Sequence, residues 1–206
     1  MTRKRVDNYL SKIDIIPHRS EGESVLLDLI SKKTKRILDL GSGNGRLIKL
    51  LKEHGHNAEF VAIDFSPYML EELSKQFLDD TSVKKIKHDL SFPLPSNIGK
   101  FDVVVSSFAI HHLTNRRKKG LYSEIFMLLK RGGIFCNLDH IFTDSKHLNT
   151  FFRKKMGHKV INKEHNKRLT KLDVQLDWLS DIGFTDVDCY WKWLEFALII
   201  GYKPFR

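Results

Sequence analysis

The sequence predicts an α/β fold with a mostly parallel sheet, and three observations carry this prediction. The apolar run 37–40 is followed by three glycines at alternate positions and then by apolar residues at helical spacing. A second apolar run, 60–63, ends at Asp64. A third run, 101–106, is almost continuously apolar, as expected for a strand buried on both faces of a parallel sheet. Strand, tight turn and helix in this order form the first unit of a nucleotide-binding α/β fold.

An extension, residues 1–34, precedes the first of these strands. Residues 20–23, Ser-Glu-Gly-Glu, resemble a helix capping box. They lead into apolar positions between Val25 and Ile30, which predict an amphipathic helix packed on the flank of the sheet. The preceding residues 15–19 are expected to form a loop.

The turn after the first strand contains Gly41, Gly43 and Gly45. Glycine suits such a turn because the backbone adopts angles that a side chain forbids, and because a ligand approaches the backbone closely near a helix N-terminus. A dinucleotide-binding turn would have its third glycine at position 46, where this chain has Arg46.

Asp64 lies at the tip of the second predicted strand. An acidic side chain in this position is placed to accept hydrogen bonds from ribose hydroxyls. Ser66 is a good N-cap and Pro67 suits the first position of a helix, so these residues predict that a helix begins here.

The second half of the chain continues the alternation of strands and helices. We expect Thr114 to cap a helix and Gly183 to end another. The expected elements are a strand at 83–87, a loop at 91–99, a helix after 114, a strand at 134–138, a helix at 170–182, and an antiparallel pair of strands at 184–191 and 194–202 with a turn at 191–193.

Two basic segments stand out. Residues 116–119, Arg-Arg-Lys-Lys, fall on the first turn of a predicted helix, where the helix dipole disfavours cations. They indicate either an external anion or a solvated turn. Residues 144–171 carry nine Lys or Arg against two acids.

Five segments resemble, in order, the motifs of class I S-adenosylmethionine (SAM)-dependent methyltransferases. The pattern G-x-G-x-G after L-D-L resembles their motif I, and the segments 62–70, 87–90, 101–113 and 129–134 resemble later motifs. Arg131 replaces the proline usual in the last of these, which we expect to affect turn rigidity more than chemistry. The resemblance implies one domain, 1–206, with a Rossmann-like seven-stranded, mostly parallel sheet, helices on both faces and a C-terminal antiparallel hairpin. It also implies that residues 1–34 form a helical lid and 141–171 a basic cover over the substrate.

The resemblance further implies which residues bind SAM, with S-adenosylhomocysteine as the product. The glycine turn would lie along the methionine and ribose, supported by Asp39, while Asp64 holds the ribose and Arg19 meets the methionine carboxylate. For Arg19 and Met69 the alternatives are a solvated loop arginine and an ordinary core methionine. The expected cofactor-binding residues are Arg19, Asp39, Gly41, Ser42, Gly43, Asn44, Gly45, Asp64, Phe65, Met69, His88, Asp89, Leu90, Ser106 and Ser107.

Two histidines are candidates for catalysis. His111 follows the 101–106 strand and His140 follows the fifth strand, so both fall at the C-terminal edge, where parallel sheets bind ligands. Either could take a proton from the acceptor or contact the substrate. The alternative is a structural imidazole bonded to backbone, since methyl transfer often needs only positioning.

Composition limits the remaining possibilities. The net charge of +10 fits RNA or another anionic partner, but also a lysine-rich solvated surface. There is no apolar run of about eighteen residues and no signal-peptide pattern, and two embedded cysteines fit a reducing compartment, so we expect a cytoplasmic protein without a membrane span. No Cys/His cluster has zinc spacing, and we expect no metal.

The methyl acceptor stays open at this point. A small molecule is the first expectation, with a monomer or homodimer as the functional form. The alternatives are transfer to RNA, a carboxy-SAM synthase that acts in tRNA modification, and a regulator that binds SAM without catalysis. The glycine turn and Asp64 indicate binding only, so they do not separate these alternatives.

Overall fold

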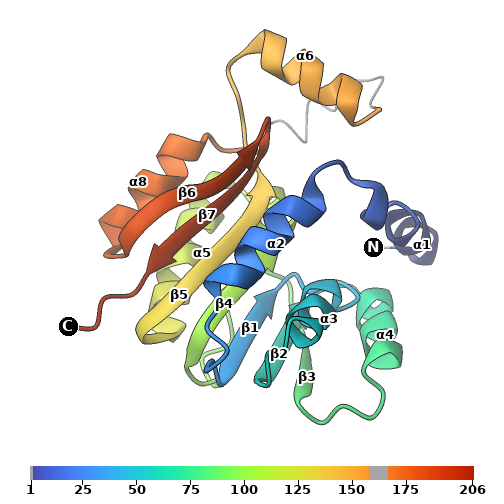
Figure 1. Ribbon diagram of the computed structural model, residues 1–206, viewed down its shortest axis with the longest axis vertical. Coiled ribbons are helices and arrows are strands. Elements are labelled where there is room, and N and C mark those ends of the chain that lie inside the picture. Colours follow the sequence, from blue (N-terminus) through green and yellow to red (C-terminus); the bar gives the residue numbers. More distant parts are fainter. Residues whose placement is uncertain (1, 158–166) are drawn as a thin grey trace.

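The computed structural model describes residues 2–157 and 167–206, and the sheet at its centre has seven strands. The strand order is β3-β2-β1-β4-β5-β7-β6, with β7 antiparallel to both of its neighbours and the other neighbouring strands parallel. The strands are β1 (Arg36–Leu40), β2 (Glu59–Asp64), β3 (Val83–Lys87), β4 (Phe101–Ser107), β5 (Leu129–His140), β6 (Thr185–Trp193) and β7 (Phe196–Tyr202). The predicted sheet is thereby confirmed (Figure 1).

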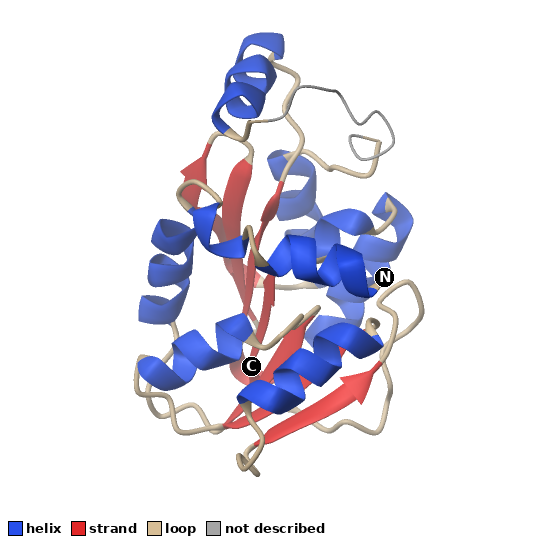
Figure 2. Cartoon of the chain, turned by 90° about the vertical axis from the view of Figure 1, so that its right-hand side faces the viewer, coloured by secondary structure: helices blue, strands red, loops and turns tan. Residues whose placement is uncertain are grey.

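Helices cover both faces of the sheet (Figure 2). Alternate residues of β1 show why: Leu38 and Leu40 face one core and Ile37 faces the other. The helices are α1 (Arg3–Leu10), α2 (Arg19–Leu29), α3 (Arg46–Glu53), α4 (Pro67–Gln76), α5 (Asn115–Leu128), α6 (Lys146–Lys155) and α8 (Leu172–Ile182), with short 3-10 turns at Ile13–Ile15 and Ile110–His112. Helices α2 and α3 pack on the Ile37 face, and α5 and α8 on the other.

Several predicted helix ends are confirmed by their capping bonds. The hydroxyl of Ser66 accepts a hydrogen bond from the Met69 amide at the start of α4. Thr114 does the same for Arg117 at the start of α5. Gly183 ends α8 in the left-handed conformation, with φ of 111°. These ends were predictable because capping depends on residues close in sequence.

The expected N-terminal boundary of α2 is wrong. The helix begins at Arg19, with His18 as a left-handed N-cap at φ 59° and no side-chain capping bond. Ser20 therefore lies inside the first turn and does not form a capping box. An additional helix, α1, lies before it and is tied to α4 by ion pairs from Arg3 to Glu71 and Glu72.

Two strand boundaries also differ from expectation. Strand β5 begins at Leu129 rather than at 134, because Leu129 already pairs with Phe101 of β4. A register irregularity follows, in which Gly132 has φ of 74°. The hairpin turn is at Leu194–Glu195 rather than at 191–193, so both tryptophans of this segment, Trp191 and Trp193, belong to β6. Aromatic residues fit a pleated strand better than a tight turn.

The 116–119 run is not simply a solvated turn. Arg117 forms an ion pair with Glu124 and donates to the carbonyl groups of Leu90 and Phe92, and Lys118 is almost fully buried. Only the outer members, Arg116 and Lys119, are exposed. Among the described residues no helix is long and apolar enough to cross a membrane.

Candidate functional site

Steric contacts fix the glycine loop between β1 and α3. Gly41 has φ of 71°, and a Cβ there would lie 2.2 Å from the Cβ of Ala109. Gly45 has φ of 85°, and its Cβ would lie 2.6 Å from the ring of Phe77. Both positions therefore exclude any other residue on two independent grounds, backbone conformation and space.

Gly43 presents bare backbone at the centre of this loop. A Cβ there would meet only the Met69 sulfur, at 3.8 Å, so the surface above the loop stays open to a ligand. The Gly43 amide donates to one carboxylate oxygen of Asp64 at 2.9 Å, and the Ser66 amide donates to the other at 2.8 Å. Asp64 thus ties the glycine loop to the start of α4 and retains lone pairs for further donors.

Two buried carboxyl groups lie behind the loop. Burial, and then the charge of Asp64, raise the pKa of Asp39 to about 7. Burial also raises the pKa of Asp64, against the opposing effect of its backbone hydrogen bonds. One Asp39 carboxylate oxygen is buried without a hydrogen-bond partner among the described residues. A ligand with hydroxyl or ammonium donors is the kind of group that such an acceptor fits.

We expect Asp39→Asn to change the pH dependence of stability. The folded chain keeps the Asp39 proton up to about pH 7, while the unfolded chain loses it near the ordinary pKa of 3.8. Wild-type stability should therefore fall by about 3 kcal/mol between pH 5 and 8 on this account, and Asp39→Asn should remove that fall. Urea unfolding at pH 5 and 8 measures it, with the exposed Asp79→Asn as control. Equal pH slopes in wild type and Asp39→Asn would contradict the assignment.

The residues expected around the adenine gather at the tips of β2 and β3. Phe65 is half exposed, whereas Met69 is buried beside Gly43. Asp89 is exposed, and one of its oxygens accepts a hydrogen bond from the Ser91 amide at 2.8 Å. The remaining members of this group are His88, whose amide donates to the Asp64 carbonyl, and Leu90, which lies beside Gly41.

Arg19 is buried, with only 4% of its surface exposed, so the alternative of a solvated loop arginine is wrong. It donates to Glu23 at 2.7 Å and to the Ser107 hydroxyl at 3.2 Å, and it lies over the ring of Phe108. Through these contacts Arg19 connects α2 to the C-terminal end of β4.

Arg46, the residue that departs from the dinucleotide pattern, also binds Glu23. Its guanidinium donates to both carboxylate oxygens, at 3.1 and 2.9 Å, and also pairs with Asp14. The N-terminal extension is thus fastened to the glycine loop by one carboxylate shared between Arg19 and Arg46. Sequence reasoning missed this network because Glu23 and Arg46 are 23 positions apart in the chain.

Ser106 and Ser107 lie at the end of β4. The Ser106 hydroxyl is buried and donates to the Leu40 carbonyl at 2.8 Å, which joins β4 to β1 directly below the glycine loop. In the neighbouring glycine loop, the Ser42 hydroxyl is buried and has no hydrogen-bond partner among the described residues. Asn44 belongs to the same turn, which a bond from the Gly45 amide to the Ser42 carbonyl closes.

His111 and Asp139 form a buried pair across the ends of β4 and β5. The His111 ring nitrogen Nδ1 bonds one oxygen of Asp139, and its backbone amide donates to the other at 2.8 Å. Burial alone would raise the pKa of Asp139, but the His111 contacts and two backbone amides hold it below its usual value. This geometry fixes the orientation of the imidazole.

His140 forms a second pair, with Glu195. Its Nε2 lies 2.9 Å from a Glu195 oxygen, and the Asn149 side chain of α6 donates to the other oxygen at 2.9 Å. Burial lowers the pKa of His140 despite the nearby acid. The centres of the His111 and His140 rings are 6.0 Å apart, so the structure brings the two candidate histidines together. Sequence reasoning missed Glu195, although an isolated acidic residue directly before an apolar strand could have indicated a role at the sheet edge.

An aromatic cluster surrounds this pair and receives α6. Phe152 of α6 packs against His140, Trp193 and Phe196 with ring centres 5.0 to 5.9 Å apart. His18 stacks on Trp193 from the other side, with centres 4.3 Å apart. Trp193 thus connects the residue before α2 with α6 at the edge that carries the two histidines.

Lys118 belongs to α5 and lies on that face of the sheet, near the His111–Asp139 pair. Its amine donates to the Thr170 hydroxyl at 2.9 Å and to the Arg168 carbonyl. Burial lowers its pKa to about 8, against the attraction of Asp139. The two hydrogen bonds of Lys118 attach the segment before α8 to α5. In the expected basic cover, Lys159, Lys163 and the histidines 158 and 165 lie outside the described residues.

Comparison with known proteins relates the first half of the sheet to a methyltransferase domain. Residues 37–133 match the family described as "Methyltransferase domain". A carboxy-S-adenosyl-L-methionine synthase of Nautilia profundicola is 21% identical over 91% of this chain and 87% of its own length. An uncharacterized methyltransferase of Anoxybacillus flavithermus is 34% identical over 54% of this chain and 50% of its own length.

Solved structures agree with the observed fold. An O-methyltransferase family protein from Burkholderia thailandensis superimposes with a TM-score of 0.71 at 16% identity, covering 91% of this chain and 56% of that chain. The chain thus spans about half the length of some proteins it matches. The match over residues 37–133, the fold and the glycine loop together support a class I SAM-dependent methyltransferase.

Proposed function

We propose that the enzyme transfers the methyl group of SAM to a small-molecule acceptor bound beside His111 and His140. The observation that carries this proposal is the buried His111–Asp139 pair, located at the sheet edge next to the glycine loop. An oriented imidazole with a carboxylate behind it suits an acceptor that must lose a proton as it is methylated. Bound SAM supplies a methyl group that its cationic sulfur makes labile.

The residues of the glycine loop have distinct roles in this proposal. The bare backbone at Gly43 lies along the methionine, and Asp64 holds the ribose hydroxyls while keeping the loop closed on α4. The unpartnered oxygen of Asp39 receives a donor of the cofactor. Arg19, already bonded to Glu23 and Ser107, faces the methionine carboxylate from α2.

His111 acts as the general base. It removes the acceptor proton, and Asp139 stabilises the resulting imidazolium. His140 and Glu195 line the same edge, where they position the acceptor. Helix α1 forms the lid and α6 the cover, and together they exclude water from the transfer.

We expect the basic end of α6 to act on acceptor use and not on SAM binding. Reversing the charge at Arg153, Lys154 and Lys155 to glutamate should lower acceptor turnover by about tenfold while SAM affinity stays within twofold. A matched control reverses Lys32, Lys33 and Lys35 at the opposite edge of the sheet. Steady-state kinetics and calorimetry give the two quantities. Unchanged turnover would make this end of α6 a solvated cover only.

A carboxy-SAM synthase activity is the second candidate. The observation in its favour is that such a synthase matches this chain over most of both lengths, although at only 21% identity. Transfer to RNA is the third, favoured by the charge of +10. A reducing, cytoplasmic location fits both free cysteines, Cys136 and Cys189.

Label transfer separates these candidates. Purified protein is incubated with methyl-tritiated SAM and, side by side, total small RNA and a deproteinised metabolite extract. Label in the metabolite pool supports the first proposal, and label in RNA replaces it with the third. Label in neither, together with a carboxylated cofactor detected by mass spectrometry of the purified protein, favours the synthase.

A further inference from the structure

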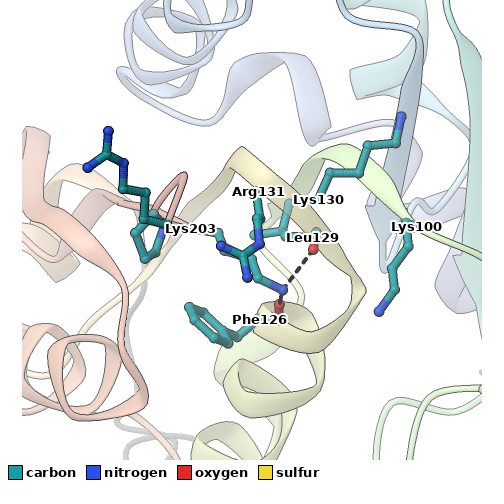
Figure 3. A pocket seen from close by; sticks show the side chains of 8 residues that line it. Lys100, Phe126, Leu129, Lys130, Arg131 and Lys203 are labelled. Atoms are coloured by element: carbon teal, nitrogen blue, oxygen red, sulfur yellow. Dashed lines mark hydrogen bonds between the residues drawn. The ribbon is translucent and has the colours of Figure 1, made fainter.

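A basic pocket lies at the edge of the sheet opposite the glycine loop. It measures about 420 Å³, within the usual range for small-ligand sites. Its walls come from the start of β5, the end of α5, the residue before β4 and the tail after β7. The lining residues are Lys100, Phe126, Leu129, Lys130, Arg131, Lys203, Pro204 and Arg206, five of them cationic and none acidic (Figure 3).

This pocket is well separated from the methyl-transfer site. Strand β4 begins beside the pocket at Phe101 and ends near the cofactor at Ser107. Seven extended residues span about 20 Å, so the two sites lie on opposite edges. A ligand here does not compete for the SAM site.

Backbone bonds hold the pocket walls in place. The Gly132 amide donates to the Lys203 carbonyl, and the Lys203 amide donates to the Gly133 carbonyl, both at 2.8 Å. A Cβ on Gly132 would lie 2.2 Å from the ring of Phe205, so the tail fits closely against this glycine. The cations therefore project from a fixed frame.

The positive charge of the pocket exceeds what its neighbours neutralise. Asp102 pairs with Lys130 at 2.7 Å. The Lys203 amine donates to the carbonyl groups of Phe126 and Leu129, at the negative end of the α5 dipole. That helix end contributes only about half a negative charge, so roughly three positive charges remain in excess. Partial burial, together with repulsion from Lys100 and Arg131, lowers the pKa of Lys203.

We infer that this pocket binds a phosphate group, presented either by a nucleotide or by an RNA backbone. Arg131 and Arg206 are the residues that meet it, because guanidinium groups bind phosphate oxygens in pairs. Residues 129–134 resemble a motif in which proline is usual at the position of Arg131. In this inference the Arg131 side chain binds phosphate, in addition to the effect on turn rigidity that the sequence predicts.

Calorimetry with the SAM site saturated by S-adenosylhomocysteine tests this inference. The probes are inorganic pyrophosphate, ATP and a short single-stranded oligouridylate, each at low salt. We expect binding that weakens at least about tenfold in the double variant Arg131→Ala/Arg206→Ala, since charge-assisted hydrogen bonds are lost. Both side chains are exposed, so the fold should be kept, and unchanged S-adenosylhomocysteine affinity verifies it.

The control removes the same charge at the other end of α5, as Arg116→Ala/Lys119→Ala, and should bind like wild type. Tighter binding of ATP than of pyrophosphate identifies a nucleotide ligand. Tighter binding of the oligouridylate, with a steep loss of affinity in salt, identifies an RNA backbone. Absence of binding by all three probes, or equal weakening in both double variants, would overturn the inference. None of these outcomes depends on the methyl acceptor.

Discussion

Replacing Asp64 with alanine should weaken SAM binding by about a hundredfold, the largest effect we expect on cofactor affinity. The carboxylate is proposed to hold the ribose hydroxyls, and hydrogen bonds to a charged group each contribute about 1.5–3 kcal/mol. It also accepts the Gly43 and Ser66 amides, so its loss loosens the loop as well. Calorimetric titration with SAM measures the change.

Two variants help to interpret this result. Glu59→Ala removes an acid from the other end of β2 and should leave SAM affinity unchanged. Asp64→Asn retains acceptor capacity for one of the two amides and should give an intermediate affinity. Wild-type affinity in Asp64→Ala would refute the ribose assignment and move the cofactor away from the tip of β2.

Replacing His111 with alanine should lower kcat by roughly a hundredfold or more, the usual contribution of a general base. SAM affinity should stay within twofold, because the imidazole is assigned to the acceptor. The rate at high pH should recover partly, since an acceptor that ionises in solution no longer needs the base. Single-turnover kinetics with the acceptor found by label transfer measure the loss.

The neighbouring His112→Ala is the matched control, since this exposed ring is next to His111, with centres 3.9 Å apart and the ring planes tilted by 48°. It should keep kcat within a few-fold. A similar kcat in wild type and His111→Ala would show that the enzyme works by positioning alone. The His111–Asp139 pair would then be structural, as the alternative interpretation of the sequence holds.

The sequence was sufficient for those parts of the site that depend on local patterns. The glycine turn, the acid at the tip of β2 and the Ser66 cap are each encoded within a few residues, and their backbone requirements exclude most substitutes. The alternation of buried strands and helices likewise predicted the parallel sheet. These features were recoverable because each is a short-range constraint.

The parts that sequence reasoning missed depend on partners far apart in the chain. Glu23 is shared by Arg19 and Arg46, and Glu195 is bonded to His140. Lys118 is buried against Thr170, more than fifty positions away. A charged residue in a sequence usually indicates a solvated surface, and only the fold reveals that these are desolvated and paired.

The position of β7 has a consequence for synthesis of the chain. This strand follows the other six of the sheet in the sequence, yet it lies between β5 and β6. While the nascent chain leaves the ribosome, β1 to β4 can pair as they emerge, but one edge of β5 stays open until residues 196–202 are released. An open apolar edge recruits other chains, so a chain that terminates before β7 should aggregate rather than fold partially.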